Sequence, residues 1–172
     1  MENSSIIAVI NQKGGVGKTT TVINLASSLS ILGQRNLIID LDPQGNATTG
    51  LGKSNNDEEN NIYNLLIKKI ELRNVIQKTD IENLDIIGSN VNLSGLEVET
   101  ANDSDRAFVL KQILEKEKHG ILSKYNNIFI DCPPSLSLLT SMALVGSDEL
   151  LVPLQTEFFA LEGITQLVKT ID

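Results

Sequence analysis

The sequence predicts an α/β fold, with a mostly parallel central sheet flanked by helices on both faces. Four short apolar runs, at residues 6–10, 37–39, 128–130 and 150–152, lack polar alternation. Such runs are typical of strands that are covered on both faces. Amphipathic helical patterns separate the runs, which favours parallel strands joined by helices. The length of 172 residues fits a single domain, residues 1–172, that is large enough to bury a core.

A glycine-rich turn at residues 11–20 lies between the first strand and the first helix. Its glycines allow a tight bend in which successive N–H groups and a helix N-terminus face one anion. Lys18 then reaches the β- and γ-phosphates of a nucleotide, and the Thr19 hydroxyl holds Mg²⁺. The turn therefore predicts a phosphate-binding loop.

Helical spacing of apolar residues predicts the remaining elements. The helix after the glycine-rich turn runs from Val22 to Leu32 and ends near Gly33, which is placed as a C-terminal cap. Polar residues 52–61 predict a surface loop. Further helices are expected over 62–70, 106–118 and 138–145 and from about residue 158, and weaker strands over 74–76 and 84–87.

Two carboxylates follow the second strand. Asp40 and Asp42 are two residues apart, so both side chains are expected to point toward the crevice at the carboxyl end of the sheet. Pro43 and Gly45 then force a turn. For Asp40 a second interpretation stays open, in which its carboxylate only accepts hydrogen bonds from the loop.

Asp131 directly follows the buried strand at 128–130, where a Mg²⁺-holding carboxylate of a nucleotide site is expected. Pro133 and Pro134 remove two N–H donors and stiffen the segment, which suits a loop that responds to the γ-phosphate. Cys132 is interpreted as a small buried apolar residue rather than a reactive thiol.

Composition limits the classes of partner. With 14 basic and 22 acidic residues the net charge is −8, so the chain as a whole repels nucleic acid. Its densest basic groups, Lys68-Lys69 and Lys116 to Lys118, are interpreted as solvated helix faces, and His119 as a helix-capping surface residue. We expect a cytoplasmic protein without a membrane segment, because signal and spanning patterns are lacking and the single cysteine cannot form an internal disulfide.

The glycine-rich turn departs from the strict phosphate-loop spacing, since Gln12 stands where a glycine is required and Lys13 precedes the glycines. This pattern resembles the deviant Walker A motif of the ParA/MinD superfamily, and Gln12 favours its ParA branch. Residues 40–46, 131–135 and 157–163 resemble further ParA stretches. The resemblance implies a P-loop ATPase that requires Mg²⁺, dimerises around two ATP molecules, binds DNA non-specifically and segregates chromosomes or plasmids with a ParB partner.

The resemblance also implies roles for single residues. Lys18 would contact the phosphates, Lys13 would reach the partner subunit's nucleotide, and Asp42 would orient the attacking water, which makes these three the catalytic set. Thr19 and Asp131 would hold Mg²⁺, Thr20 would contact the α-phosphate and Asp40 would support the switch. The implied nucleotide-binding set is Lys13, Gly14, Gly15, Val16, Gly17, Lys18, Thr19, Thr20, Asp40 and Pro133.

The chain stops before the later strands and helices of such a family, which carry much of the adenine pocket and the basic DNA-binding residues. It is therefore expected to be a C-terminally shortened form, with DNA binding and nucleoid association dependent on the later part. Three alternatives are a nucleotide-binding module without hydrolysis, a membrane-surface ATPase of the MinD kind and a metabolic phosphotransferase. The MinD alternative needs a basic amphipathic helix, and residues 166–172 are too short and too weakly basic.

Overall fold

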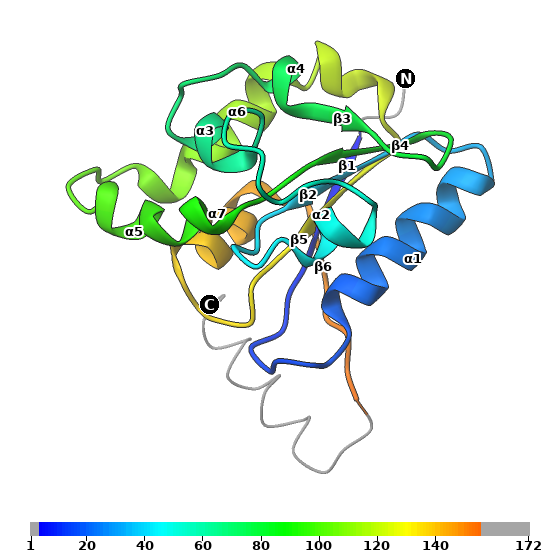
Figure 1. The fold of residues 1–172 in the computed structure, drawn as a ribbon, viewed down its shortest axis with the longest axis horizontal. Helices are drawn as coiled ribbons and strands as arrows, with labels where there is room; N and C mark the ends of the chain where they lie inside the picture. The colour runs from blue at the N-terminus through cyan, green and yellow to red at the C-terminus, as the bar shows by residue number, and fades with distance from the viewer. Residues whose placement is uncertain (1–3, 156–172) are drawn as a thin grey trace.

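The fold is seen in a computed structural model that describes residues 4–155. Its described part holds one six-stranded sheet with helices on both faces (Figure 1). The spatial order is β3-β4-β2-β5-β1-β6. The strands are β1 (Ser5–Val9), β2 (Asn36–Asp40), β3 (Ile76–Lys78), β4 (Leu84–Ile87), β5 (Asn127–Asp131) and β6 (Glu149–Leu151). The mostly parallel sheet of the sequence prediction is thus confirmed.

The strand register brings three chain segments to the same edge of the sheet. All neighbouring strands are parallel except β3, which pairs antiparallel with β4. Val9 at the end of β1 and Asp40 at the end of β2 both lie beside Asp131 at the end of β5. The glycine-rich turn and both strand-end aspartates therefore leave the sheet side by side.

The seven α-helices of the described part connect these strands. They are α1 (Lys18–Ile31), α2 (Asn46–Gly50), α3 (Ile62–Leu66), α4 (Leu72–Val75), α5 (Leu96–Glu99), α6 (Val109–Glu117) and α7 (Leu138–Gly146). Short 3₁₀ turns occupy Val91–Gly95, Arg106–Phe108 and Ile121–Lys124. The expected end of the first helix is confirmed, because Gly33 follows α1 with φ of 88°, a left-handed conformation that glycine adopts without strain.

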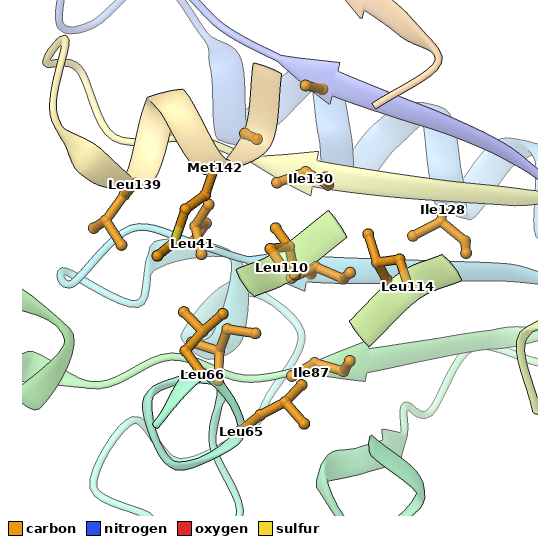
Figure 2. Close-up of a cluster of buried hydrophobic side chains, with 14 of the residues drawn as sticks. Leu41, Leu65, Leu66, Ile87, Leu110, Leu114, Ile128, Ile130, Leu139 and Met142 are labelled. Atoms are coloured by element: carbon orange, nitrogen blue, oxygen red, sulfur yellow. The ribbon is translucent and has the colours of Figure 1, made fainter. Parts of the chain in front are cut away.

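Two apolar cores lie on opposite faces of the sheet. One packs Val22 and Ala26 of α1 against Ile38 and Phe129. The larger core joins the other face of the strands to α3, α6 and α7, and Figure 2 shows Leu110 and Leu114 of α6 directed toward the strand residues Ile128 and Ile130. Burial on both faces explains why these strands read as continuous apolar runs.

The sequence prediction was wrong at one strand boundary and missed two short helices, α2 and α5. The strand expected over 74–76 starts only at Ile76, because residues 72–75 form α4. Leu72 and Val75 are both buried, and only a helical turn places residues three apart on one face. Of the missed helices, α2 begins after Gly45, which has φ of 63°, and α5 follows the 3₁₀ turn at Val91–Gly95. The expected helix over 62–70 is shorter, and that over 106–118 opens with a 3₁₀ turn. The helix expected from about residue 158 lies outside the described residues.

Candidate functional site

The glycine-rich turn ends in an uncapped helix N-terminus. Gly15 and Gly17 adopt left-handed φ values of 75° and 88°, which bend the backbone directly into α1. Gly17 is the N-cap of α1, and no side chain caps the helix there. The first-turn N–H groups of a helix carry a partial positive charge and need an acceptor. The turn can thus receive an anion such as a phosphate.

Gly17→Ala is expected to weaken nucleotide binding by about tenfold or more, because the added Cβ occupies the turn that faces the phosphate. Nothing in the protein lies within 4 Å of that Cβ. The free energy of unfolding should therefore fall only by the cost of the left-handed conformation, about 1–2 kcal/mol. Gly33→Ala is the matched control, since Gly33 has the same φ and equally open surroundings far from the turn. Urea unfolding and nucleotide titration of both variants test this. Equal nucleotide affinities would contradict it.

A cavity of about 500 Å³ lies over this helix N-terminus. Seven of the predicted site residues line it, together with three that the sequence did not single out as ligands, Ile23, Asn46 and Pro134. The seven are Gly14, Gly15, Gly17, Lys18, Thr19, Thr20 and Asp42. The structure therefore gathers residues from the turn, from α1, from the end of β2 and from the segment after β5 around one hollow.

Lys18 is the buried cation of this cavity. Its side chain is 6% exposed, and its Nζ donates to the Lys13 carbonyl oxygen at 3.2 Å. Burial lowers the pKa of Lys18 below its ordinary value, while the carboxylates of Asp131 and Asp42 oppose that change. A phosphate entering the cavity would supply the negative charge that favours the charged form of Lys18.

The carboxylates of Asp40, the last residue of β2, and of Asp42 have different environments, so the expectation that both face the crevice is wrong for Asp40. Asp42 lines the cavity, and its Oδ1 accepts a hydrogen bond from the Gln44 N–H at 2.9 Å. Asp40 is fully buried, where Oδ2 accepts from the Thr48 N–H at 2.8 Å and from its hydroxyl at 2.6 Å. Asp40 thus follows the second interpretation, because α2 folds back over the end of β2 and supplies its donors.

Thr48 links three segments of the site. The Asp42 N–H donates to Asp40 Oδ1 at 3.2 Å, and the Thr48 hydroxyl oxygen accepts from the Ser89 N–H at 2.9 Å. Burial raises the pKa of Asp40 to about 6, against the hydrogen bonds from Thr48 and Asp42, which lower it. The segment that carries Asp42 is therefore fastened to α2 and to the end of β4.

Thr48→Val is expected to destabilise the protein by about 2 kcal/mol at pH 8, because Asp40 loses a hydroxyl donor and the Ser89 N–H loses its acceptor. Since that donor stabilises the charged carboxylate, the loss should shrink as the pH falls below about 6 and Asp40 becomes protonated. Thr48→Ser keeps the hydroxyl and should stay near the wild type. Urea unfolding at pH 5 and pH 8 measures both. A pH-independent difference between the Val and Ser variants would argue against the linkage.

Asp131 ends β5 beneath the cavity and is fully buried. Neither carboxylate oxygen has a hydrogen-bond partner among residues 4–155. Burial raises the pKa of Asp131 to about 7, and the charges of Asp40 and Asp42 raise it further. The nearby Thr19 hydroxyl lowers this pKa, although it forms no hydrogen bond of normal geometry with the carboxylate. An unpartnered buried carboxylate beside a threonine hydroxyl fits hydrated Mg²⁺, which prefers such oxygen donors.

The described residues contain no group of three or more His, Cys, Asp or Glu side chains arranged as metal ligands. A Mg²⁺ ion here would thus need phosphate oxygens and water in addition to Thr19 and Asp131. Cys132 beside Asp131 is 1% exposed, and burial raises the pKa of its thiol well above the ordinary range. It is a buried apolar residue, as the sequence predicted.

Three members of the predicted nucleotide-binding set besides Asp40 lie outside the cavity wall. Val16 is buried behind the turn, and Lys13 is exposed beside it. Pro133 lines a separate small hollow with Pro43, while Pro134 faces Gly14 across the cavity. The sequence could not distinguish the two prolines, because which of them turns toward the turn depends on the path of the chain after β5.

The turn is also tied to the chain after β6. The Asn11 side-chain amide donates to the Pro153 carbonyl oxygen at 2.8 Å, and its Oδ1 accepts from the Lys13 N–H at 2.9 Å. The Gln155 side chain donates to the Gly15 carbonyl oxygen at 3.1 Å. The phosphate-binding turn is thus held on both sides, by its own helix and by residues about 140 positions later.

Comparison with known proteins identifies the family. The family described as "AAA domain" matches residues 4–172. The sporulation initiation inhibitor protein Soj of Bacillus subtilis is 47% identical over 166 residues, and the alignment covers 96% of this chain and 64% of Soj. The chromosome partitioning protein ParA of Caulobacter vibrioides is 44% identical, with 97% and 62% covered. The chain belongs to the ParA/Soj family. It spans a little under two thirds of the length of these curated relatives.

Solved structures share the fold of this ParA/Soj chain, and one of them is a plasmid partition protein. A plasmid partition protein from Borrelia burgdorferi superposes with a TM-score of 0.84 at 31% identity, covering 98% of this chain and 73% of that one. A structure described as cobyrinic acid a,c-diamide synthase from Mycobacterium smegmatis, with bound ADP and magnesium, gives 0.90 at 35% identity, covering 98% and 66%. The fold of this ParA/Soj chain is therefore one in which a related protein holds a nucleotide and Mg²⁺.

Proposed function

We propose that this chain belongs to an ATP-hydrolysing dimerisation switch that segregates chromosomes or plasmids. The observation that carries the proposal is a single cavity that combines the uncapped N-terminus of α1, the buried ammonium of Lys18 and the carboxylate of Asp42. Transfer of a γ-phosphoryl group to water needs positive charge on the phosphate oxygens and a group that orients the water. Lys18 offers the positive charge and Asp42 the group that orients the water, and both line the same cavity.

Each residue has a separate part in the proposed reaction. The N–H groups that open α1 and the Lys18 ammonium bind the phosphates, and Thr20 contacts the α-phosphate. Thr19 and Asp131 would hold Mg²⁺, which would supply further positive charge beside the phosphates. Asp42 accepts a hydrogen bond from the attacking water and orients it in line with the bond that breaks. Asp40 and Thr48 hold the backbone of Asp42 in place.

The proposed dimer depends on Lys13. Its side chain is exposed at the rim of the turn, where it can reach the phosphates of a nucleotide bound to a second copy. The partition role follows from the relatives named Soj and ParA, and implies a ParB-like protein and DNA as partners. No helix among residues 4–155 is both long and apolar enough to cross a membrane.

Light scattering on the Asp42→Ala variant tests the switch, because blocked hydrolysis should trap the ATP-bound state. We expect a doubled mass with Mg²⁺-ATP, the monomer mass with Mg²⁺-ADP, and the monomer mass with both nucleotides once Lys13→Ala is added. Phosphate release by the wild type, absent in Asp42→Ala, tests hydrolysis separately. A monomer under all conditions would refute the dimer, and tight binding without turnover would leave a nucleotide-binding module.

A further inference from the structure

A second hollow is lined by residues of α3, α4 and α6 and of the segment between α3 and α4. These three helices lie on the same face of the sheet (Figure 1). The hollow has a volume of about 540 Å³ and shares no lining residue with the nucleotide cavity. One wall is the segment from the end of α3 through α4, residues 65–73, and the other is the C-terminal half of α6. We call it the α3–α6 groove.

The floor of the α3–α6 groove is apolar. Leu65 and Leu72 are buried, and Ile70 and Ile113 are half-buried with part of each side chain packed on the main core. Figure 2 places Leu65 at the edge of that core. A rigid apolar floor that opens to solvent is the usual seat for the anchor side chains of a bound segment.

The rim of the groove is positively charged. It carries four cations, Lys68, Lys69, Arg73 and Lys116, and two carboxylates, Glu71 and Glu117. Arg73 Nε pairs with Glu71 Oε2 at 3.1 Å, while the three lysines form no ion pair with any residue of the described part. The fold thus brings the two separate basic groups of the sequence together, against a chain net charge of −8.

Lys68 takes a conformation that a lysine rarely adopts. Its φ is 60°, and it ends α3 as the left-handed residue of a Schellman cap, in which the Lys68 N–H donates to Leu65 O and the Lys69 N–H to Asn64 O. Glycine is the favoured residue at such a position, because any Cβ adds strain. The charge of Lys68 can therefore be removed without harm to the fold.

We infer that the α3–α6 groove docks an acidic segment of a partner protein, with apolar anchor residues on the floor and carboxylates facing Lys68, Lys69 and Lys116. Complementary charge selects such a segment, and the apolar floor supplies the contacts that exclude water. A phosphate backbone is disfavoured, since it carries no apolar side chain to occupy the floor and the floor offers it no donors. A concave hollow also fits a single segment better than a flat lipid surface.

The test starts from a displayed library of random peptides of about 12 residues, a length that fills such a groove in extended or helical form. Selection on the wild-type chain should enrich sequences that combine Asp or Glu with Leu, Ile or Phe. One selected peptide, labelled with fluorescein, is then titrated by anisotropy. Binding should weaken by about tenfold or more in Lys68→Gly/Lys116→Gln. Lys53→Gln/Lys78→Gln, with the same change in net charge elsewhere, should bind as the wild type does.

Thermal unfolding checks that weaker binding is not caused by unfolding of the variant, since Lys68→Gly should be at least as stable as the wild type. Three outcomes would overturn the inference. The library yields no acidic and apolar sequences; the peptide binds the groove variant and the control variant equally; or labelled duplex DNA or phosphatidylserine vesicles, instead of peptides, bind the wild type and lose binding only in the groove variant.

Discussion

Replacing Lys18 with alanine is expected to weaken binding of Mg²⁺-ATP by about 100-fold, because a charge-assisted contact to phosphate is lost from a buried position. The apo fold should keep its stability. Burial lowers the pKa of Lys18, which means that the surroundings disfavour its charge until an anion arrives. Titration with a fluorescent ATP analogue, with urea unfolding in parallel, measures both quantities.

Lys53→Ala is the matched control for this loss, since Lys53 is a half-buried lysine outside the cavity wall. It should leave nucleotide affinity within about twofold of the wild type. An unchanged affinity of Lys18→Ala would mean that the uncapped helix N-terminus alone binds the phosphates. A Lys18→Ala chain that is unfolded in buffer would show that the ammonium has a structural role that the cavity does not explain.

Asp131→Asn is expected to stabilise the nucleotide-free protein at pH 8. The pKa of Asp131 is raised to about 7 in the folded protein from 3.8, so its contribution to stability is full below about pH 4 and is lost as the pH rises through 7. At 1.36 kcal/mol for each pKa unit the loss is about 4 kcal/mol. An unpartnered asparagine amide costs about 2 kcal/mol, which leaves a net gain of about 2 kcal/mol.

Urea unfolding from pH 5 to pH 8, without metal, tests this expectation. The wild type should lose stability across the range and Asp131→Asn should lose less, whereas the exposed control Asp80→Asn should follow the wild type. With Mg²⁺-ADP the order should reverse, because only the wild type has a carboxylate for the metal. Parallel pH curves for wild type and Asp131→Asn would show that the carboxyl titrates near its ordinary pKa.

Much of the fold could be predicted because its signals are local. Strands covered on both faces need continuous apolar runs, and β4 was found even from a weak pattern, as Leu84–Ile87. The phosphate-binding turn was equally visible, since left-handed glycines and a helix start occur in a fixed order. The boundary at α4 failed because Val75 and Ile76 are both β-branched, a local preference that burial of Leu72 and Val75 on one face overrides.

The site was less predictable where it depends on how the chain folds back. Spacing alone placed Asp40 and Asp42 on the same side, but the return of α2 gives Asp40 two hydrogen bonds from Thr48 and leaves Asp42 in the cavity wall. No sequence pattern linked Thr48 to Asp40, because they are eight positions apart and a helix starts between them. The sequence also could not show which of Pro133 and Pro134 lines the cavity, because that depends on the path of the chain after β5.

The buried thiol beside Asp131 can report how often this part of the site opens. Cys132 is the one cysteine of the chain, it is 1% exposed, and its raised pKa keeps it protonated. An alkylating reagent can therefore reach it only during moments when the segment after β5 swings away from the sheet. The alkylation rate of Cys132 then measures how often the segment opens. A ligand that holds the cavity closed would lower that rate without contacting Cys132.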